Sequence, residues 1–373
     1  MESTFPFGFS GSLSFYLSLY VLTLVLHAFF MTYVLAGSLY LAWTTIFPGA
    51  TDHPRGQQPL ALILKDWMPF VLSAAITAGV APLLFVQVLY RQQFYTANLL
   101  LGLRWLLVVP VLIIAFYLLY VWKSQFVARW SVASRVILAA GVAGCFVFVA
   151  FCWTANHLLA LNQQSWASAY GGGSVVSSVS SLLARLATWI AGAFPTMSIL
   201  AGWQLWHFRS RSGNQEAAEQ EAAAKGTRHL CLVSLAGLAF AVGSAVVYAA
   251  MLDKPLQDAV LGSAGRVWLV ATAAGVVLQA VCWVMVLKRK QLTTLSLAMI
   301  SVAGVIALIG TASLREVMRL AQSSLETVTE NARLAEAVGG LGLFLGSSVI
   351  AGLLITGCVL VTRWGRKPGS EAA

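Results

Sequence analysis

The sequence predicts an all-α polytopic membrane protein, a transmembrane helix bundle of about nine spans. Apolar residues make up 59% of the 373 positions and charged residues only 10%, and no water-soluble domain can bury that much apolar surface. The apolar runs are about 20 residues or longer, which is the length of a transmembrane helix and not of a β-barrel strand. Because lipid offers no hydrogen bonds to the backbone, we expect each run to be helical.

The predicted spans follow one another along the chain with short polar connections. The last of them begins with Gly342 and Gly346, whose spacing favours close packing against another helix. The nine predicted spans are 17–43, 67–90, 103–121, 136–160, 186–208, 230–252, 267–287, 295–314 and 341–361.

The distribution of lysine and arginine predicts the orientation. Fifteen of the 23 basic residues follow odd-numbered spans, among them Lys123, Lys290 and Lys367. Basic residues are retained on the cytoplasmic side, so we expect an outer N-terminus, a cytoplasmic C-terminus and a location in the bacterial cytoplasmic (inner) membrane. Topology also accounts for the net charge of +10, and binding of nucleic acid is not expected.

Two polar segments suggest a division of the chain. We predict a five-span N-terminal bundle over residues 1–208, a cytoplasmic linker over 209–229 and a four-span C-terminal bundle over 230–373. The linker contains Glu-Ala-Ala-Glu-Gln-Glu-Ala-Ala-Ala-Lys, which is typical of a helical spacer. Residues 165–181 are rich in Gly and Ser and predict an outer loop with little structure of its own.

An amphipathic helix is predicted over residues 314–338, continuing the eighth span outward. Its apolar residues recur at steps of four and three, as on one face of a helix. This face is expected to contact the bundle itself, the membrane surface or another subunit. The residues on it are Leu314, Met318, Ala321, Leu325, Val328, Ala332 and Ala335.

Few ionisable side chains are predicted inside the membrane. No Asp or Glu falls in the middle of a span, which argues against an ion-coupled transporter. His27 is the one ionisable residue predicted deep in the membrane, and we interpret it as a candidate metal ligand for haem or as a hydrogen-bond donor to a quinone. The alternative is a neutral histidine bonded to a neighbouring carbonyl or hydroxyl group. His157 is a second candidate, predicted at a different depth near the outer surface.

Several polar residues are predicted at the outer ends of the spans. Residues of four spans share this level: Gln87, Tyr90 and Arg91 at the exit of the second span, Asn156 late in the fourth, Arg185 at the start of the fifth, and Arg315 and Arg319 after the eighth. With His157, these groups are candidates for binding a quinol headgroup or haem propionates. The alternative is a belt of residues that contact lipid headgroups.

The amino-acid sequence of the second span resembles that of a known family. Residues 66–96 contain Asp-Trp-Met-Pro-Phe, then Ile-Thr-Ala-Gly-Val-Ala-Pro-Leu-Leu-Phe-Val-Gln-Val-Leu-Tyr, then Gln-Phe-Tyr-Thr. This is similar to a largely uncharacterised family of bacterial polytopic membrane proteins associated with b-type cytochromes and respiratory electron-transfer modules. The likeness covers about the first 210 residues. Where relatives have Pro-Arg-Tyr-Leu-His, this chain has Thr188 in place of the histidine, which implies loss of any haem held there.

These observations predict an integral membrane subunit of a respiratory or photosynthetic electron-transfer complex. We expect it to contact haem b or a quinone near the outer face and to dock other membrane or periplasmic redox subunits, cytochromes among them, within the lipid bilayer. Two alternatives remain: a permease for a neutral solute, and a structural subunit without a cofactor.

Overall fold

The computed structural model describes residues 11–47, 59–172, 179–211, 217–338 and 340–364 and confirms the all-α class, with helices and no strand in these ranges. Eight described helices are long and apolar enough to cross a membrane, and they coincide with the first eight predicted spans. The long helices are α1 (Gly11–Ile46), α2 (Pro59–Leu89), α5 (Val108–Lys123, preceded by α4, Leu103–Leu106), α6 (Val132–Leu161), α8 (Val179–Arg211), α9 (Ala217–Ala250), α11 (Ser263–Arg289), α12 (Thr294–Ala321) and α14 (Gly340–Trp364).

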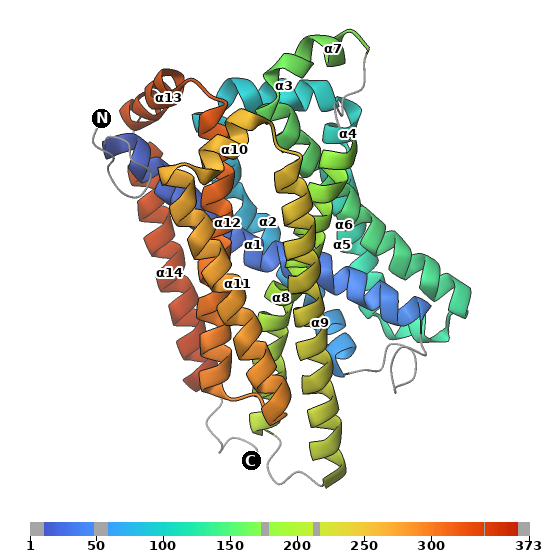
Figure 1. Ribbon diagram of the computed structural model, residues 1–373. Helices are drawn as coiled ribbons and strands as arrows, with labels where there is room; N and C mark the ends of the chain where they lie inside the picture. The colour runs from blue at the N-terminus through green and yellow to red at the C-terminus, as the bar shows by residue number, and fades with distance from the viewer. Residues whose placement is uncertain (1–10, 48–58, 173–178, 212–216, 339, 365–373) are drawn as a thin grey trace.

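The ninth predicted span corresponds to α14. This helix has 25 residues, and its described apolar stretch is the shorter segment Phe344–Leu353. The described chain begins and ends at opposite ends of the bundle (Figure 1), as an odd number of crossings requires. Lys367, one of the basic residues from which the orientation is predicted, lies outside the described residues.

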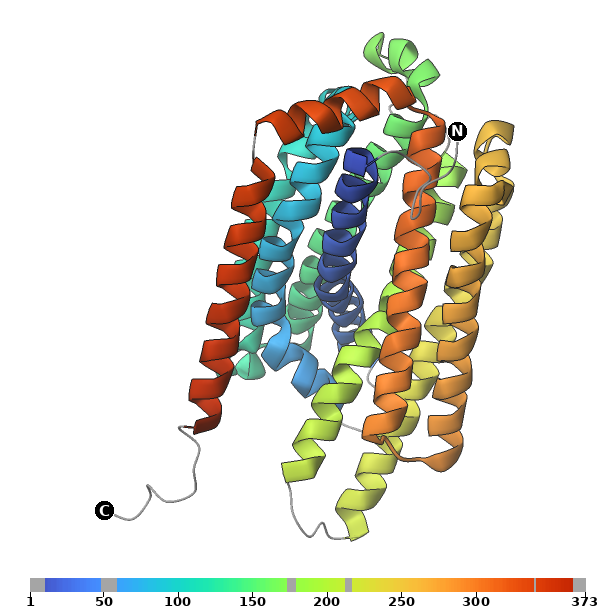
Figure 2. The same ribbon diagram turned by 90° about the vertical axis from the view of Figure 1, so that its left-hand side faces the viewer.

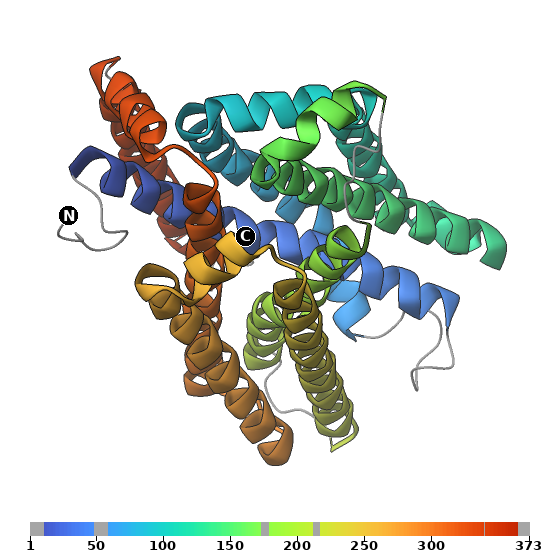
Figure 3. The same ribbon diagram turned by 45° about the horizontal axis from the view of Figure 1, so that its top comes forward.

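Sequential helices pack as antiparallel pairs around a central helix. The pairs are α1 with α2, α5 with α6, α8 with α9, and α11 with α12. Helix α1 also contacts α6, α8 and α12, and it runs obliquely through the middle of the molecule (Figure 3). The main core therefore forms around α1, with Tyr33, Met68 and Trp283 among its fully buried side chains.

Glycines allow α11 and α12 to approach closely. A Cβ atom at Gly275 would lie 2.6 Å from the backbone nitrogen of Ala307, so a larger residue would push the two helices apart. At Gly342 and Gly346, in contrast, a Cβ would meet no described atom within 4 Å. The close packing predicted from that pair is therefore not formed within the described chain.

Short helices cover one end of the bundle. They are α3 (Arg91–Leu101), α7 (Trp166–Tyr170), α10 (Lys254–Leu261) and α13 (Leu325–Ala337), and all lie at the end where α1 begins (Figure 1). We did not predict α3, although its buried residues Phe94, Ala97 and Leu101 have helical spacing. Gly102, with φ of 55°, ends this helix in a left-handed conformation that glycine adopts readily.

The predicted helix over residues 314–338 is interrupted. Helix α12 ends at Ala321, and α13 begins after Ser324, whose side chain accepts a hydrogen bond from the Thr327 amide. Val328 and Ala332 are buried in a cluster with residues of α1 and α2, and α13 crosses that end of the bundle (Figure 2). The apolar face therefore contacts the bundle itself, as one of the three alternatives expected.

The predicted linker over residues 209–229 overlaps the end of α8 and the first turns of α9. Residues 212–216 lie outside the described part of the chain. Of the Gly- and Ser-rich segment, residues 166–170 form α7 and α8 begins at Val179. Helices α8 and α9 pack against each other along the predicted boundary between the two bundles.

Candidate functional site

A cluster of polar side chains, all buried except the half-buried Asn98 and Arg315, lies beneath the short helices, at the end where α1 begins. We call it the end cluster. Its members come from the ends of α1, α2, α6, α8 and α12 and from α3. They are Tyr20, Tyr90, Asn98, Asn156, His157, Arg185, Arg315, Glu316 and Arg319.

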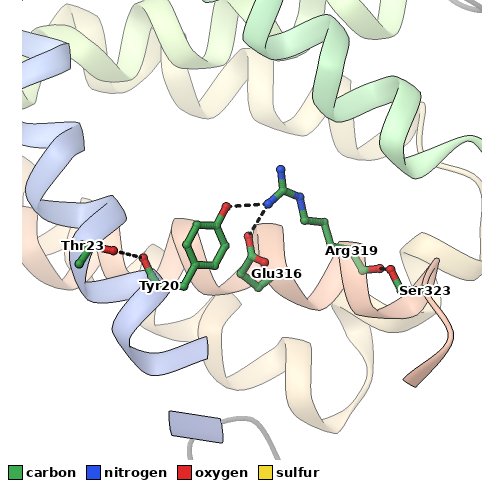
Figure 4. A network of polar contacts seen from close by, with 5 residues as sticks. All are labelled: Tyr20, Thr23, Glu316, Arg319 and Ser323. Atoms are coloured by element: carbon green, nitrogen blue, oxygen red, sulfur yellow. Dashed lines mark hydrogen bonds and ion pairs between the residues drawn. The ribbon is translucent and has the colours of Figure 1, made fainter. Parts of the chain in front are cut away.

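Arg319 connects α12 to α1 (Figure 4). Its Nη1 donates to the hydroxyl of Tyr20 at 2.6 Å and lies 3.4 Å from Oε1 of Glu316, one turn back on α12. The guanidinium also lies 5.3 Å from the centre of the Tyr90 ring, a cation–π geometry. Glu316 is fully buried and Arg319 is 4% exposed, so the ion pair within α12 is shielded from water, and the hydrogen bond to Tyr20 joins α12 to α1.

His157 lies beside this pair without a hydrogen bond. The residue is 3% exposed, and neither ring nitrogen has a partner among the described residues. The guanidinium groups of Arg185, Arg315 and Arg319 are all close enough to interact with the ring electrostatically. Buried polar groups are normally paired, so a histidine with two free nitrogens indicates a position where another molecule belongs.

The neighbouring Asn156 is only partly satisfied. Its Nδ2 donates to Oδ1 of Asn98 on α3 at 2.7 Å, whereas its Oδ1 has no partner in the described chain. The Tyr90 hydroxyl is likewise without a hydrogen bond, although Glu316 lies near it. His157 and Asn156 of α6 and Tyr90, between α2 and α3, therefore offer unpaired polar atoms.

Arg185 and Arg315 carry charges that the described carboxylates do not pair. The Arg185 guanidinium lies 5.1 Å from the centre of the Tyr248 ring, and the Nε atoms of both arginines are buried without a hydrogen bond. The ion pair of Arg319 with Glu316 is the one formed by the cluster's described residues. The end cluster is therefore positively charged.

A small cavity opens beside these groups. It is lined in part by Tyr90, Gln93, Asn156, Arg319 and Ser323, and has room of about 10 Å³ for the centre of a water molecule, which corresponds to one water site. Gln93 and Ser323 are joined across the chain by a 3.3 Å hydrogen bond. A haem or a quinone ring does not fit inside this cavity.

The structure brings together three of the six residues predicted for cofactor binding. His157, Arg185 and Arg315 all belong to the end cluster. Gln87 is half-buried and does not line the cavity, and Arg91 is exposed on the first turn of α3. Gln87 and Arg91 were predicted to lie at the same depth as the cluster, but their side chains do not line the cavity.

His27 lies apart from the cluster, where α1 packs against α2. It is seven residues beyond Tyr20, about 10 Å along the helix axis. Its Nδ1 is 2.9 Å from the backbone oxygen of Ala75, and a Cβ at Gly79 would lie 2.9 Å from its ring carbon Cε1. This is the carbonyl bond expected in the alternative interpretation. A histidine that ligates a metal through Nε2 makes the same kind of bond through Nδ1.

Sequence reasoning missed three members of the cluster: Tyr20, Asn98 and Glu316. Glu316 was assigned to the outer amphipathic helix after the eighth span, but it lies in α12, which continues to Ala321 and buries it completely. The available signal was the spacing of Glu316 and Arg319, which lie on one face of a helix. Asn98 was missed because α3 was not predicted.

No protein-family model and no curated protein matches this sequence. Among solved structures, a chain of the bd oxidase from Geobacillus thermodenitrificans matches with a TM-score of 0.61 and 12% sequence identity. The match covers 96% of this chain and 99% of that chain. This polytopic bundle therefore has, over nearly its whole length, the fold of a chain of a bd oxidase.

Proposed function

We propose that this chain is an integral membrane subunit of a bacterial respiratory electron-transfer complex. The likeness of fold to a bd oxidase chain carries this proposal, because it extends over almost all of both chains. In the same proposal the end cluster lies on the outer side of the membrane and contacts a quinone or a haem. Other membrane or periplasmic redox subunits, cytochromes among them, are the expected partners.

The described residues of the end cluster are suited to contact the edge of a quinone or haem, and they do not enclose its whole ring. The cavity at the end cluster has room for one water, so this chain does not enclose a ring there. The free donors of His157, Arg185 and Arg315 suit a carbonyl or carboxylate oxygen that projects from a cofactor held by a partner. Bound haem or quinone would supply the electron transfer, and these side chains would bind and orient it.

His27 is the candidate axial ligand for a haem that lies against α1 and α2. Its bond to Ala75 directs Nδ1 to the backbone and leaves Nε2 for a ligand. The ring is held in this orientation by contact with Gly79. Ligation of a haem iron by Nε2 of His27 is our proposal, because a neutral imidazole nitrogen is a suitable ligand for this metal.

A structural subunit without a cofactor is the second candidate, and Thr188 favours it. Relatives in the resembling family have a histidine at this position, whereas the hydroxyl of Thr188 donates to the Ala184 carbonyl of its own helix at 2.9 Å. A permease gains no support from the buried carboxylate found in α12. Glu316 accepts a hydrogen bond from Arg319 and is therefore neutralised within the chain.

Purification of the tagged protein from its native membranes in mild detergent tests the proposal. Mass spectrometry of the subunits, a pyridine haemochrome spectrum and quinone extraction would be made on the same sample. We expect at least one haem-containing subunit to co-purify, together with haem or quinone. Partners without either cofactor would support the structural candidate, and a chain that purifies alone without cofactors would refute the respiratory proposal.

A further inference from the structure

We infer that the end cluster binds an oxyanion, the carboxylate or phosphate group of a larger molecule, between His157, Arg185 and Arg315. The inference deepens the proposed function and rests on it for the role of the site. The argument for the ligand itself comes from charge and hydrogen bonding in the described residues.

The first step is the balance of charge. The end cluster holds three guanidinium groups, of Arg185, Arg315 and Arg319, and one carboxylate, of Glu316, so three positive charges less one negative charge leave two uncompensated. Glu316 is engaged by Arg319. Arg185 is only 6% exposed, and a buried charge without a partner is strongly unfavourable. A bound anion would compensate it.

The second step concerns the buried polar atoms that have no hydrogen-bond partner. Both nitrogens of His157 and the Nε atoms of Arg185 and Arg315 are buried and unpaired among the described residues. They come from α6, α8 and α12, and the ring of His157 lies within electrostatic range of both guanidinium groups. Arginine side chains bind planar or tetrahedral oxyanions through several N–H groups at once.

The third step distinguishes an oxyanion from a neutral ligand. A quinone carbonyl would accept one or two hydrogen bonds but would leave both positive charges uncompensated. A carboxylate or phosphate supplies several acceptor oxygens together with the charge. Haem propionates and phospholipid headgroups both contain such an oxyanion. The site therefore binds a carboxylate or phosphate group, and the experiment below identifies the molecule to which that group belongs.

The cavity borders the end cluster at Tyr90, Asn156 and Arg319, and its lining does not include His157, Arg185 or Arg315. The cavity beside the cluster holds one water in this conformation, and its lining includes Gln93 and Ser323, whose 3.3 Å hydrogen bond links α3 to the segment between α12 and α13. Separation of these two side chains would open a path from the covered end of the bundle to Arg319 and Asn156. The larger molecule would remain outside, with only its charged group inserted.

The test measures thermal unfolding of the full-length protein in detergent, with inorganic phosphate or sodium propionate as the probe and sodium chloride at the same ionic strength as reference. Binding to the folded state raises the midpoint by mass action, and we expect about 2–4 °C at concentrations well above Kd. Arg185→Gln and Arg315→Gln should each remove this shift. Arg185→Lys, which keeps the charge but loses Nε, should retain part of it.

The matched control is Arg266→Gln. Arg266 is exposed at the same end of the bundle and bonds only to the Leu261 carbonyl, so its variant should keep the full shift. The inference is wrong if wild type shows no shift beyond that of chloride, or if Arg266→Gln loses the shift as Arg185→Gln does. Because two cluster arginines are replaced separately, failure of one variant to fold leaves the comparison intact.

Phosphorus and haem content of the purified proteins then identify the source. Retention of one anionic phospholipid per wild-type chain, lost in Arg185→Gln, would assign the group to a lipid. Loss of haem in that variant would assign it to a propionate. An anion-dependent shift in a chain that has neither partners nor haem would refute the respiratory proposal and support the oxyanion site, whereas a haem-containing complex without any shift would do the reverse.

Discussion

At the scale of single residues, the depth of a residue in the membrane could be predicted from the sequence, but the side of the helix that it occupies relative to the neighbouring helices could not. Counting along the spans placed Gln87, Arg91, His157, Arg185 and Arg315 near one level. The structure assembles only the last three, since Gln87 is half-buried, Arg91 is exposed and neither lines the cavity. The rotation of a helix depends on its packing partners, and α1, α2 and α6 are apolar on nearly all sides, so their sequences contain little information about it.

The buried ion pair shows a second limit. Glu316 and Arg319 lower the mean hydropathy of the last turns of α12, so the span was predicted to end at residue 314 and the helix continues to Ala321. A charge that is neutralised by a partner on the same face looks, in the sequence, like the polar face of a helix outside the membrane. The partner on α1, Tyr20, was unpredictable because it is far away in the chain.

His27 provides the first prediction. His27→Gln keeps a side-chain donor for the Ala75 carbonyl but no imidazole nitrogen for a metal, whereas His27→Ala removes both. If His27 ligates haem as proposed, both variants should lose haem absorbance at equal protein. His27→Ala should in addition lose about 1 kcal/mol of stability, as is usual for one hydrogen bond. Visible spectra and thermal unfolding provide the measurements.

Unchanged spectra in both variants would leave His27 with a purely structural role between α1 and α2. His157→Ala is the companion variant. Because His157 lies in the end cluster and His27 about 10 Å further along α1 than Tyr20, the two replacements are expected to affect different properties of the complex.

At the scale of elements, amphipathic helices were the least predictable. The stripe over residues 314–338 was found in the sequence, but the break at Gln322–Ser324 was not, because Ser324 acts as an N-cap only once α13 turns across the bundle. Helix α3 was missed because its apolar residues Phe94, Ala97 and Leu101 make a short pattern between two long apolar runs.

The second prediction concerns the packing of α13. Val328→Asp should destabilise the protein by about 2–4 kcal/mol, since Val328 is 1% exposed and a charge would be forced into an apolar contact. Leu325→Asp is the matched control on the same helix, because Leu325 is 38% exposed and should tolerate the change. Abundance in membranes and the midpoint of thermal unfolding report the difference. Equal losses in the two variants would mean that a partner covers Leu325 or that α13 packs differently.

At the scale of the whole molecule, the class of fold and the number of long helices followed from composition and from the lengths of the apolar runs. Their arrangement did not. Helix α1 contacts α12 as well as α2, α6 and α8, and long-range contacts of this kind have no signature in the pattern of one sequence. The predicted division into bundles over 1–208 and 230–373 stays a prediction.

Orientation in the membrane is the third prediction. Helix α5 ends at Lys123 and α11 at Arg289, just before Lys290, and these helix ends lie at the end of the bundle opposite to α7 and α13 (Figure 1). The excess of basic residues after odd-numbered spans predicts that reporter fusions after Lys123 and Lys290 are cytoplasmic and that fusions at Gly172 and Gln322 are external. A complete reversal would place the end cluster on the cytoplasmic side, and a mixed result would mean that the crossings are miscounted.

The central claim is that this bundle works within a respiratory electron-transfer complex and that its end cluster takes part. The most direct measurement is quinol oxidation by the complex purified through this chain, for wild type, Arg185→Gln and Arg266→Gln at equal protein. We expect wild type and Arg266→Gln to oxidise quinol at similar rates and Arg185→Gln to be slower by about tenfold, the effect of a loss near 1.4 kcal/mol. The absence of quinol oxidation from a wild-type complex with intact subunits would contradict the account.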